Sequence, residues 1–225
     1  MSDVQQQIVE LSQHLCHRGF FAATGGNLAL RIDSQRIAVT PSATDYFTMR
    51  AEDVCVLRLK DLAQLSGERA PSVESGLHAK VLRARPDVQC SIHTHQPVAS
   101  ACTLLGEPLE VLNPELWGSL GKHIPLVGYA PSGSNWLAGK FGRAIRWDYN
   151  AYLMRNHGVL CCGPDVETTL SRLEALETFC RDHLLRQITE QSRHTSQSPA
   201  GVARLVDALV RSSTANAQPS SETSS

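Results

Sequence analysis

The segment from 88 to 95 constrains the fold more than any other part of the sequence, because it alternates like a strand and carries two histidines. Side chains alternate between the faces of a strand, so His93 and His95 share one face while Ile92 and Thr94 share the other. Two imidazoles at this spacing can both reach one metal ion, most often zinc. Two exposed histidines on a sheet would give the same pattern, so a metal site needs a third ligand from elsewhere.

Composition and charge exclude several classes of protein. The chain has 225 residues and a formal net charge of −1, which suits one ordinary globular domain and gives no positive field to attract nucleic acid. No apolar run approaches the roughly 20 residues that span a bilayer, and the first ten residues do not resemble a signal peptide. The seven cysteines are odd in number and scattered along the chain, which is typical of reduced cysteines in a protein core and not of a disulfide framework. We therefore expect a cytoplasmic protein with no nucleic-acid or membrane partner.

The apolar periodicity predicts a mixture of helices and strands without a doubly wound pattern, and hence an α/β fold. A domain is expected over 1–190, a linker with a short helix over 191–211, and a disordered tail over 212–225. Helices are expected over 4–19, 74–86, 97–106, 134–145 and about 166–190, and strand-like segments over 20–33, 36–43, 53–59, 88–95, 123–130 and 151–163.

His157 is the best candidate for the third metal ligand. It follows the apolar segment 151–154 and precedes a glycine, so it stands at a strand end from which a side chain can enter a shared site. A lone histidine there would more often be structural, but with His93 and His95 it completes the three-imidazole set of a catalytic zinc with an open position. A structural zinc is less consistent with this set, because such sites usually take four ligands that include cysteine.

A second group of polar residues lies at the start of the helix expected over 74–86. Glu74 stands at this helix start, where a carboxylate can simply interact favourably with the helix dipole. Alternatively, it can act as a general acid/base beside a metal-bound carbonyl. His78 follows one helical turn later. Ser72 and the free backbone N–H groups at the helix start suit an anion such as phosphate.

Two turns could complete an anion pocket. Gly25 and Gly26 allow close backbone approach, and Asn27 offers an amide donor. Thr40 and Ser42 offer hydroxyls. Such stretches are also common as ordinary turns, and the dinucleotide fingerprint G-x-G-x-x-G is absent.

Taken in order, these motifs resemble the class II aldolase/adducin family over roughly residues 5–190. The motifs are T-G-G-N-L, T-P-S, P-S-x-E with a histidine four residues later, H-T-H and N-H-G-V-L. The resemblance implies a single three-layer α/β/α domain around a mainly antiparallel central sheet, in C4 homotetramers with active sites between subunits. It also implies that His93, His95 and His157 bind one zinc ion per subunit, that Glu74 is the acid/base, and that Asn27, Ser42 and Ser72 hold a substrate phosphate.

The resemblance further implies a zinc-dependent lyase. Zinc would polarise the carbonyl of a fuculose-1-phosphate-like ketose and stabilise an enediolate, and cleavage would give dihydroxyacetone phosphate and an aldehyde. Three departures concern the substrate. Val73 replaces a second serine of the fuculose-phosphate enzymes and Ala43 replaces a glycine, and no tyrosine follows Tyr152.

Glu115 keeps a second activity open, because it resembles a glutamate that methylthioribulose-1-phosphate dehydratases of this family carry after H-T-H. The run 40–47 lacks the S-G-x-x-K-G signature of those dehydratases, so we favour an aldolase. Sugar-phosphate epimerases and decarboxylases share the scaffold and stay open. Adducin-type assembly proteins lack the metal histidines, which favours an enzyme here.

Overall fold

The computed structural model describes residues 3–21 and 25–193, together with residues 200 and 204. Most of the linker and short helix expected over 191–211, and all of the tail over 212–225, lie outside the described residues. The last described helix continues to Arg193, three residues beyond the end expected from the sequence. The domain boundaries stay predictions. Among the described helices, none is long and apolar enough to cross a membrane.

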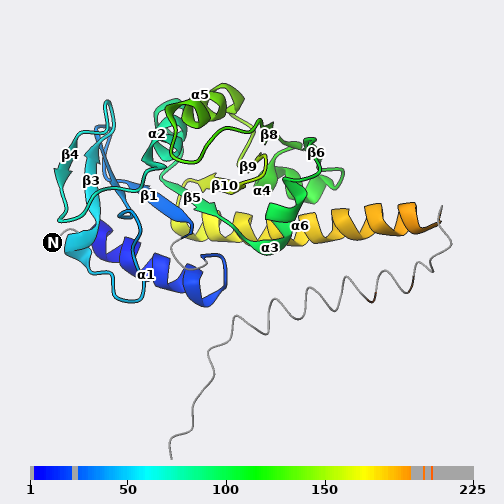
Figure 1. The fold of residues 1–225 in the computed structure, drawn as a ribbon. Coiled ribbons are helices and arrows are strands. Elements are labelled where there is room, and N and C mark those ends of the chain that lie inside the picture. The colour runs from blue at the N-terminus through cyan, green and yellow to red at the C-terminus, as the bar shows by residue number, and fades with distance from the viewer. Residues whose placement is uncertain (1–2, 22–24, 194–199, 201–203, 205–225) are drawn as a thin grey trace, which may run out of the picture.

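A mixed sheet of eight strands forms the centre of the fold (Figure 1). All neighbouring strands pair antiparallel except β8 and β9, which pair parallel at one edge. In spatial order the strands are β4 (Gln64–Ser66), β3 (Cys55–Arg58), β2 (Arg36–Val39), β1 (Asn27–Arg31), β5 (Cys90–Thr94), β10 (Gly158–Gly163), β9 (Ala151–Met154) and β8 (Leu126–Val127).

Helices cover both faces of this sheet, so the predicted three-layer α/β/α architecture is confirmed (Figure 1). Helices α2 (Ser75–Ala84) and α5 (Asn135–Ala144) pack together over one face. Helices α1 (Asp3–His17), α3 (Pro97–Cys102) and α6 (Val166–Arg193) cover the other. The shorter elements are η1 (Ala51–Asp53), η2 (Pro114–Leu116), α4 (Trp117–Leu120) and the two-stranded sheet of β6 (Leu109–Glu110) and β7 (His123–Ile124).

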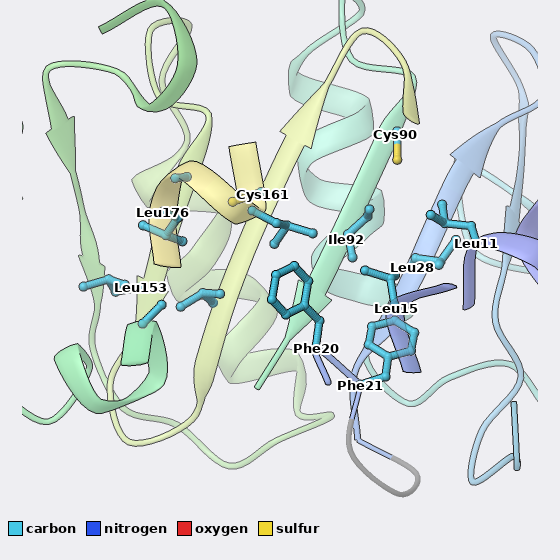
Figure 2. Close-up of a cluster of buried hydrophobic side chains, with 14 of the residues drawn as sticks. Leu11, Leu15, Phe20, Phe21, Leu28, Cys90, Ile92, Leu153, Cys161 and Leu176 are labelled. Atoms are coloured by element: carbon cyan, nitrogen blue, oxygen red, sulfur yellow. The ribbon is translucent and has the colours of Figure 1, made fainter. Parts of the chain in front are cut away.

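Strand alternation divides the buried apolar side chains into two cores. Leu28, Ile92 and Cys161 point toward α1, α3 and α6, where Figure 2 shows them among leucine and phenylalanine side chains. Ala29 and Cys162, each one residue further along the chain, point to the opposite face under α2 and α5. The cysteines at 161 and 162 therefore point to opposite faces, as expected for neighbours in a strand.

Local capping explains where the longer helices begin. The Asp165 carboxylate accepts the Thr168 N–H at 2.6 Å at the start of α6, as expected for an N-cap. The Ser134 hydroxyl accepts the Leu137 N–H at 3.1 Å at the start of α5. Helix α3 begins with Pro97 at its first turn, where a missing N–H does no harm.

The expected strand over 123–130 is divided into two parts. Residues 123–124 pair with β6, whereas residues 126–127 pair with β9. Pro125 lies between them and has no N–H to donate, so it cannot continue a ladder. The division leaves the loop 128–134 between β8 and α5, and this loop reaches the candidate active site.

Candidate active site

The three histidines that the sequence singled out lie together at the end of β5. His93 is the fourth residue of the strand and fully buried, His95 follows its end, and His157 lies in the turn between β9 and β10. The ligand atoms of the three rings lie within 4.8 Å of one another. The Nε2 atoms of His93 and His95 are 3.0 Å apart. The predicted grouping of these three side chains is therefore present in the fold.

The hydrogen bond on the far side of the His93 ring settles its tautomer. Nδ1 donates to the Val159 carbonyl oxygen at 2.8 Å, because a carbonyl oxygen can only accept. With one proton on Nδ1, the ring can offer the lone pair of Nε2 toward His95 and Glu74. A backbone partner of this kind is the usual orienting contact of a metal-binding histidine.

The donor set fits a divalent metal ion. In a tetrahedral zinc site with Zn–N distances of about 2.0–2.1 Å, ligand nitrogens lie roughly 3.4 Å apart. Here the Nε2 atoms of His93 and His95 are 3.0 Å apart, and no two ligand atoms of the three rings are more than 4.8 Å apart. Nitrogen lone pairs and a carboxylate that face one another at such distances repel unless a proton or cation lies among them. Partial burial, together with nearby His93 and His157, lowers the pKa of His95 to about 4, so its ring is neutral and able to coordinate at pH 7.

Gly158 lets the turn that carries His157 approach the other two histidines. A Cβ atom at Gly158 would lie 2.5 Å from the Thr94 carbonyl oxygen, 2.6 Å from Cδ2 of His95 and 3.0 Å from Cε1 of His93. These distances are too short for any larger residue without movement of the strand or the rings. The glycine of the N-H-G motif is thus required by close packing against the candidate ligands.

Glu74 lies beside the three histidines and is almost completely buried. Its Oε1 atom is 3.1 Å from Nε2 of His157, and its Oε2 atom is 3.2 Å from Nε2 of His93. Burial alone would raise the pKa of this carboxyl group, but the nearby rings of His157 and His93 and the hydrogen bond from Asn27 outweigh burial and hold the pKa well below its usual range. The carboxylate is therefore charged and next to the space that a metal ion and a substrate would share.

Two polar side chains orient the Glu74 carboxylate from opposite sides. Asn27 donates Nδ2–H to Oε2 at 2.9 Å, and Ser132 donates its hydroxyl to Oε1 at 2.8 Å. Sequence reasoning missed Ser132, which belongs to the loop 128–134. The stretch Pro-Ser-Gly-Ser at 131–134 reads as an ordinary turn, and nothing in it indicates that the turn folds back onto the start of α2.

The candidate phosphate-binding residues line up beside the start of α2. The segments around Pro41 and Pro71 form a bridge, in which Ser72 N–H donates to the Thr40 carbonyl oxygen at 3.0 Å and Ser42 N–H to that of Ala70 at 2.9 Å. The Ser72 hydroxyl accepts the Glu74 N–H at 3.2 Å.

Gly26 and Thr40 have structural tasks in this arrangement. Gly26 has φ of +87°, and a Cβ there would lie 2.3 Å from the Phe21 ring. Thr40 is fully buried, and its hydroxyl accepts the Leu28 N–H at 3.2 Å. This arrangement does not support direct contact between the Thr40 hydroxyl and a substrate.

Ala43 has φ of +47°, a conformation that favours glycine. The alanine that replaces the glycine of the fuculose-phosphate enzymes therefore lies where the backbone accommodates a side chain poorly.

Glu115 lies apart from this cluster. It is an exposed residue of η2, whose neighbour in the fold is α4. Its N–H donates to the Asn113 side-chain oxygen at 3.1 Å. In the part of the chain that the structure describes, Glu115 makes no hydrogen bond or ion pair with Glu74 or the three histidines. The single chain therefore does not bring the two candidate acid/base residues together.

Comparison with known proteins gives a consistent assignment. A family model described as the class II aldolase and adducin N-terminal domain matches residues 6–184. The 5-deoxy-D-ribulose 1-phosphate aldolase of Bacillus thuringiensis serovar kurstaki is 29% identical over 177 residues, covering 78% of this chain and 81% of that protein. The methylthioribulose-1-phosphate dehydratase of Serratia proteamaculans is 30% identical over 206 residues, covering 84% of this chain and 99% of that protein.

Solved structures show the same likeness. An L-fuculose 1-phosphate aldolase aligns with a TM-score of 0.72 and 25% identity, covering 94% of this chain and 97% of that one. Since the family model spans well over half of the sequence and the fold agrees, this chain belongs to the class II aldolase and adducin family, as an enzyme of the metal-dependent class II aldolase type.

Proposed function

We propose that this enzyme is a zinc-dependent lyase that cleaves a phosphorylated ketose, similar to fuculose 1-phosphate, into dihydroxyacetone phosphate and an aldehyde. The observation that carries the proposal is the position of Glu74. Its two carboxylate oxygens lie 3.1 and 3.2 Å from the Nε2 atoms of His157 and His93, so a base stands directly beside three converging imidazoles. Relatives with aldolase activity in their names support the substrate class.

His93, His95 and His157 would hold one metal ion per subunit and leave a position open for the substrate. Three neutral imidazoles suit zinc, although other divalent ions bind such sets as well. When bound, the metal would supply Lewis-acid polarisation of the ketose carbonyl.

Glu74 would move the proton in this reaction. In cleavage, the electron pair of the carbon–carbon bond passes to the fragment that carries the carbonyl, and the hydroxyl proton of the other fragment goes to a base. The carbonyl fragment leaves as an enediolate, and a proton delivered to its carbon gives dihydroxyacetone phosphate. The Glu74 carboxylate can accept and return that proton, while Asn27 and Ser132 hold its two oxygens in place.

The start of α2 would bind the phosphate. The dipole of this ten-residue helix favours an anion at its N-terminus. Asn27, Ser42 and Ser72 offer the polar side chains. Gly26 permits the positive-φ backbone that leads into Asn27. Val73 next to Ser72 is exposed and apolar, so this phosphate site has one hydroxyl fewer than a serine pair would offer.

Methylthioribulose-1-phosphate dehydratase activity is the second candidate. It is favoured by the Serratia proteamaculans relative, which this chain matches over 99% of that protein's length. This reaction would require a residue such as Glu115 to act in water loss, and the exposed position of Glu115 within the single chain does not support it.

We also propose a cytoplasmic homotetramer. The seven cysteines are free thiols, as in a reducing compartment. Exposed large apolar side chains, including Tyr129, Trp136 and Val73 near the loop that carries Ser132, offer a surface for contacts between subunits.

Mass spectrometry of products tests the proposal. Zinc-loaded protein is incubated with a panel of phosphorylated ketoses and sugar acids that includes methylthioribulose 1-phosphate, with and without chelator. Chelator-sensitive formation of dihydroxyacetone phosphate and an aldehyde is expected. Loss of water without fragmentation would contradict the aldolase assignment and favour the dehydratase.

A further inference from the structure

A buried chain of hydrogen bonds lies behind the candidate active site. His78 in α2 is fully buried, with Nε2 2.7 Å from Oδ1 of Asn27 and Nδ1 2.8 Å from the hydroxyl of Ser91. Asn27 in turn donates to Oε2 of Glu74 at 2.9 Å. The proton transfer described above uses Glu74 itself, but it assigns no task to His78 or Ser91.

The chemistry of the partners determines the direction of each hydrogen bond. The Glu74 carboxylate can only accept, so Asn27 directs its NH₂ group toward Glu74 and its oxygen toward His78. An amide oxygen also only accepts, so the proton of His78 is on Nε2. Nδ1 then accepts the Ser91 hydroxyl proton. Burial lowers the pKa of His78 to about 3, which agrees with a neutral ring.

The arrangement closes a loop through one turn of α2. Glu74 and His78 are four residues apart, so their side chains leave the same side of the helix. Asn27 lies in β1 and pairs directly with His93 of β5. The Asn27 amide therefore joins both residues of α2 to the strand pair that carries a candidate metal ligand.

We propose that His78 is a positioning residue, which fixes the orientation of the Asn27 amide and thereby holds Oε2 of Glu74 in place for proton transfer. The proposal rests on the proposed function in assigning proton transfer to Glu74. Without a donor at residue 78, Oδ1 of the buried Asn27 loses its partner, and the amide can turn its oxygen toward the carboxylate. Such a turn would replace an attraction by a repulsion and displace the base.

Two variants separate positioning from packing. His78→Leu keeps a buried apolar side chain but removes the donor, whereas His78→Gln places an amide N–H at about the reach of Nε2 and can donate to Asn27. The metal-loaded full chain is assayed for kcat and KM on the best ketose of the panel, with metal content and melting temperature measured in parallel. Nitrogen NMR of protein labelled in its histidines gives the tautomer of His78 directly.

We expect His78→Leu to lower kcat about 10- to 100-fold, as for a misplaced catalytic group, with KM changed less than about threefold and one metal ion still bound. His78→Gln should recover kcat to within about fivefold of the natural enzyme, and the spectrum should show an Nε2–H ring in the natural protein.

Three results would overturn the inference. One is an unchanged kcat in folded, metal-loaded His78→Leu, and another is equal impairment of the two variants while both fold and bind metal. The third is an Nδ1–H ring in the spectrum. Inactivity of the natural enzyme on every ketose would instead count against the proposed function. The tautomer of the His78 ring would then still test whether His78 donates to Asn27.

Discussion

Replacing Gly158 by alanine tests whether the β9–β10 turn packs directly on the candidate metal ligands. The added Cβ would lie 2.5 Å from the Thr94 carbonyl oxygen and 2.6 Å from Cδ2 of His95. Comfortable contacts between such atoms are about 3.5 Å, so each falls short by roughly 1 Å. Thr94 belongs to the strand that pairs with β10, so the chain can yield only by disturbing that pairing or by turning the histidine ring.

The expected magnitudes follow from this overlap. Overpacking of a tight site costs about 1–3 kcal/mol, and a rigid backbone carbonyl on one side favours the upper end. For a folded domain of this size, about 3 kcal/mol lowers the melting temperature by roughly 6–12 °C. A displaced His95 ring weakens one of three candidate ligands, so zinc affinity should fall at least about 10- to 100-fold.

Gly118→Ala is the matched control, because a Cβ at Gly118 would meet nothing within 4 Å beyond its chain neighbours and the backbone of its own helix. Zinc affinity is measured by competition with a chromophoric chelator, and melting is recorded for both variants without metal. Gly118→Ala should match the natural protein in both measurements. If Gly158→Ala behaves like Gly118→Ala, the close approach of the turn to the histidines is wrong.

Four further predictions address single residues. His93→Ala should lose its metal and its turnover, and retained zinc measured by elemental analysis would count against the site. Glu74→Gln should keep the metal but lose about 10²- to 10⁴-fold in turnover, whereas Glu115→Gln should cleave ketoses normally; the opposite pattern would move the base role to Glu115. The Glu177 carboxylate caps the start of α3 by accepting two backbone N–H groups, each at 2.9 Å. Glu177→Ala should therefore lower the free energy of unfolding, measured in urea, by about 1–2 kcal/mol. An unchanged urea midpoint would contradict this capping role. The buried His78 ring stabilises the fold at pH values above its unfolded pKa of about 6.5, and this stability is lost as the pH falls toward its folded pKa of about 3. Between pH 7 and pH 5 the free energy of unfolding of the natural protein should therefore fall by about 2 kcal/mol more than that of His78→Leu. Equal falls in the two proteins would contradict a buried neutral ring.

Strand alternation was sufficient to place the histidine pair. It predicts that His93 and His95 share a face, and their rings meet at 3.0 Å. Alternation does not say what covers a face, however. Ser91 and His93 on the polar side of β5 are fully buried, and their side chains find hydrogen-bond partners in His78 of α2 and in the Val159 carbonyl oxygen of β10. Those partners are more than ten residues away in sequence, so local pattern cannot identify them.

The rest of the site depends on contacts between distant loops. Ser132 reaches Glu74 from the loop between β8 and α5, far along the chain from residue 74. Thr40 looks like a ligand-binding hydroxyl in the sequence, yet its position in the fold turns it toward the Leu28 N–H. Glu115 resembles a second catalytic carboxylate in sequence alone, and spacing along the chain carries no information about its distance from the histidines.

Hydrogen exchange into dihydroxyacetone phosphate tests most directly the claim that Glu74 moves a proton beside a metal held by three histidines. Zinc-loaded protein is mixed with dihydroxyacetone phosphate in deuterated water, without an aldehyde, and the hydroxymethyl carbon is followed by proton NMR. One of its two hydrogens should exchange with solvent in the natural enzyme, and chelator or Glu74→Gln should abolish the exchange. Absence of exchange in the zinc-loaded natural enzyme, or undiminished exchange in Glu74→Gln, would contradict the account.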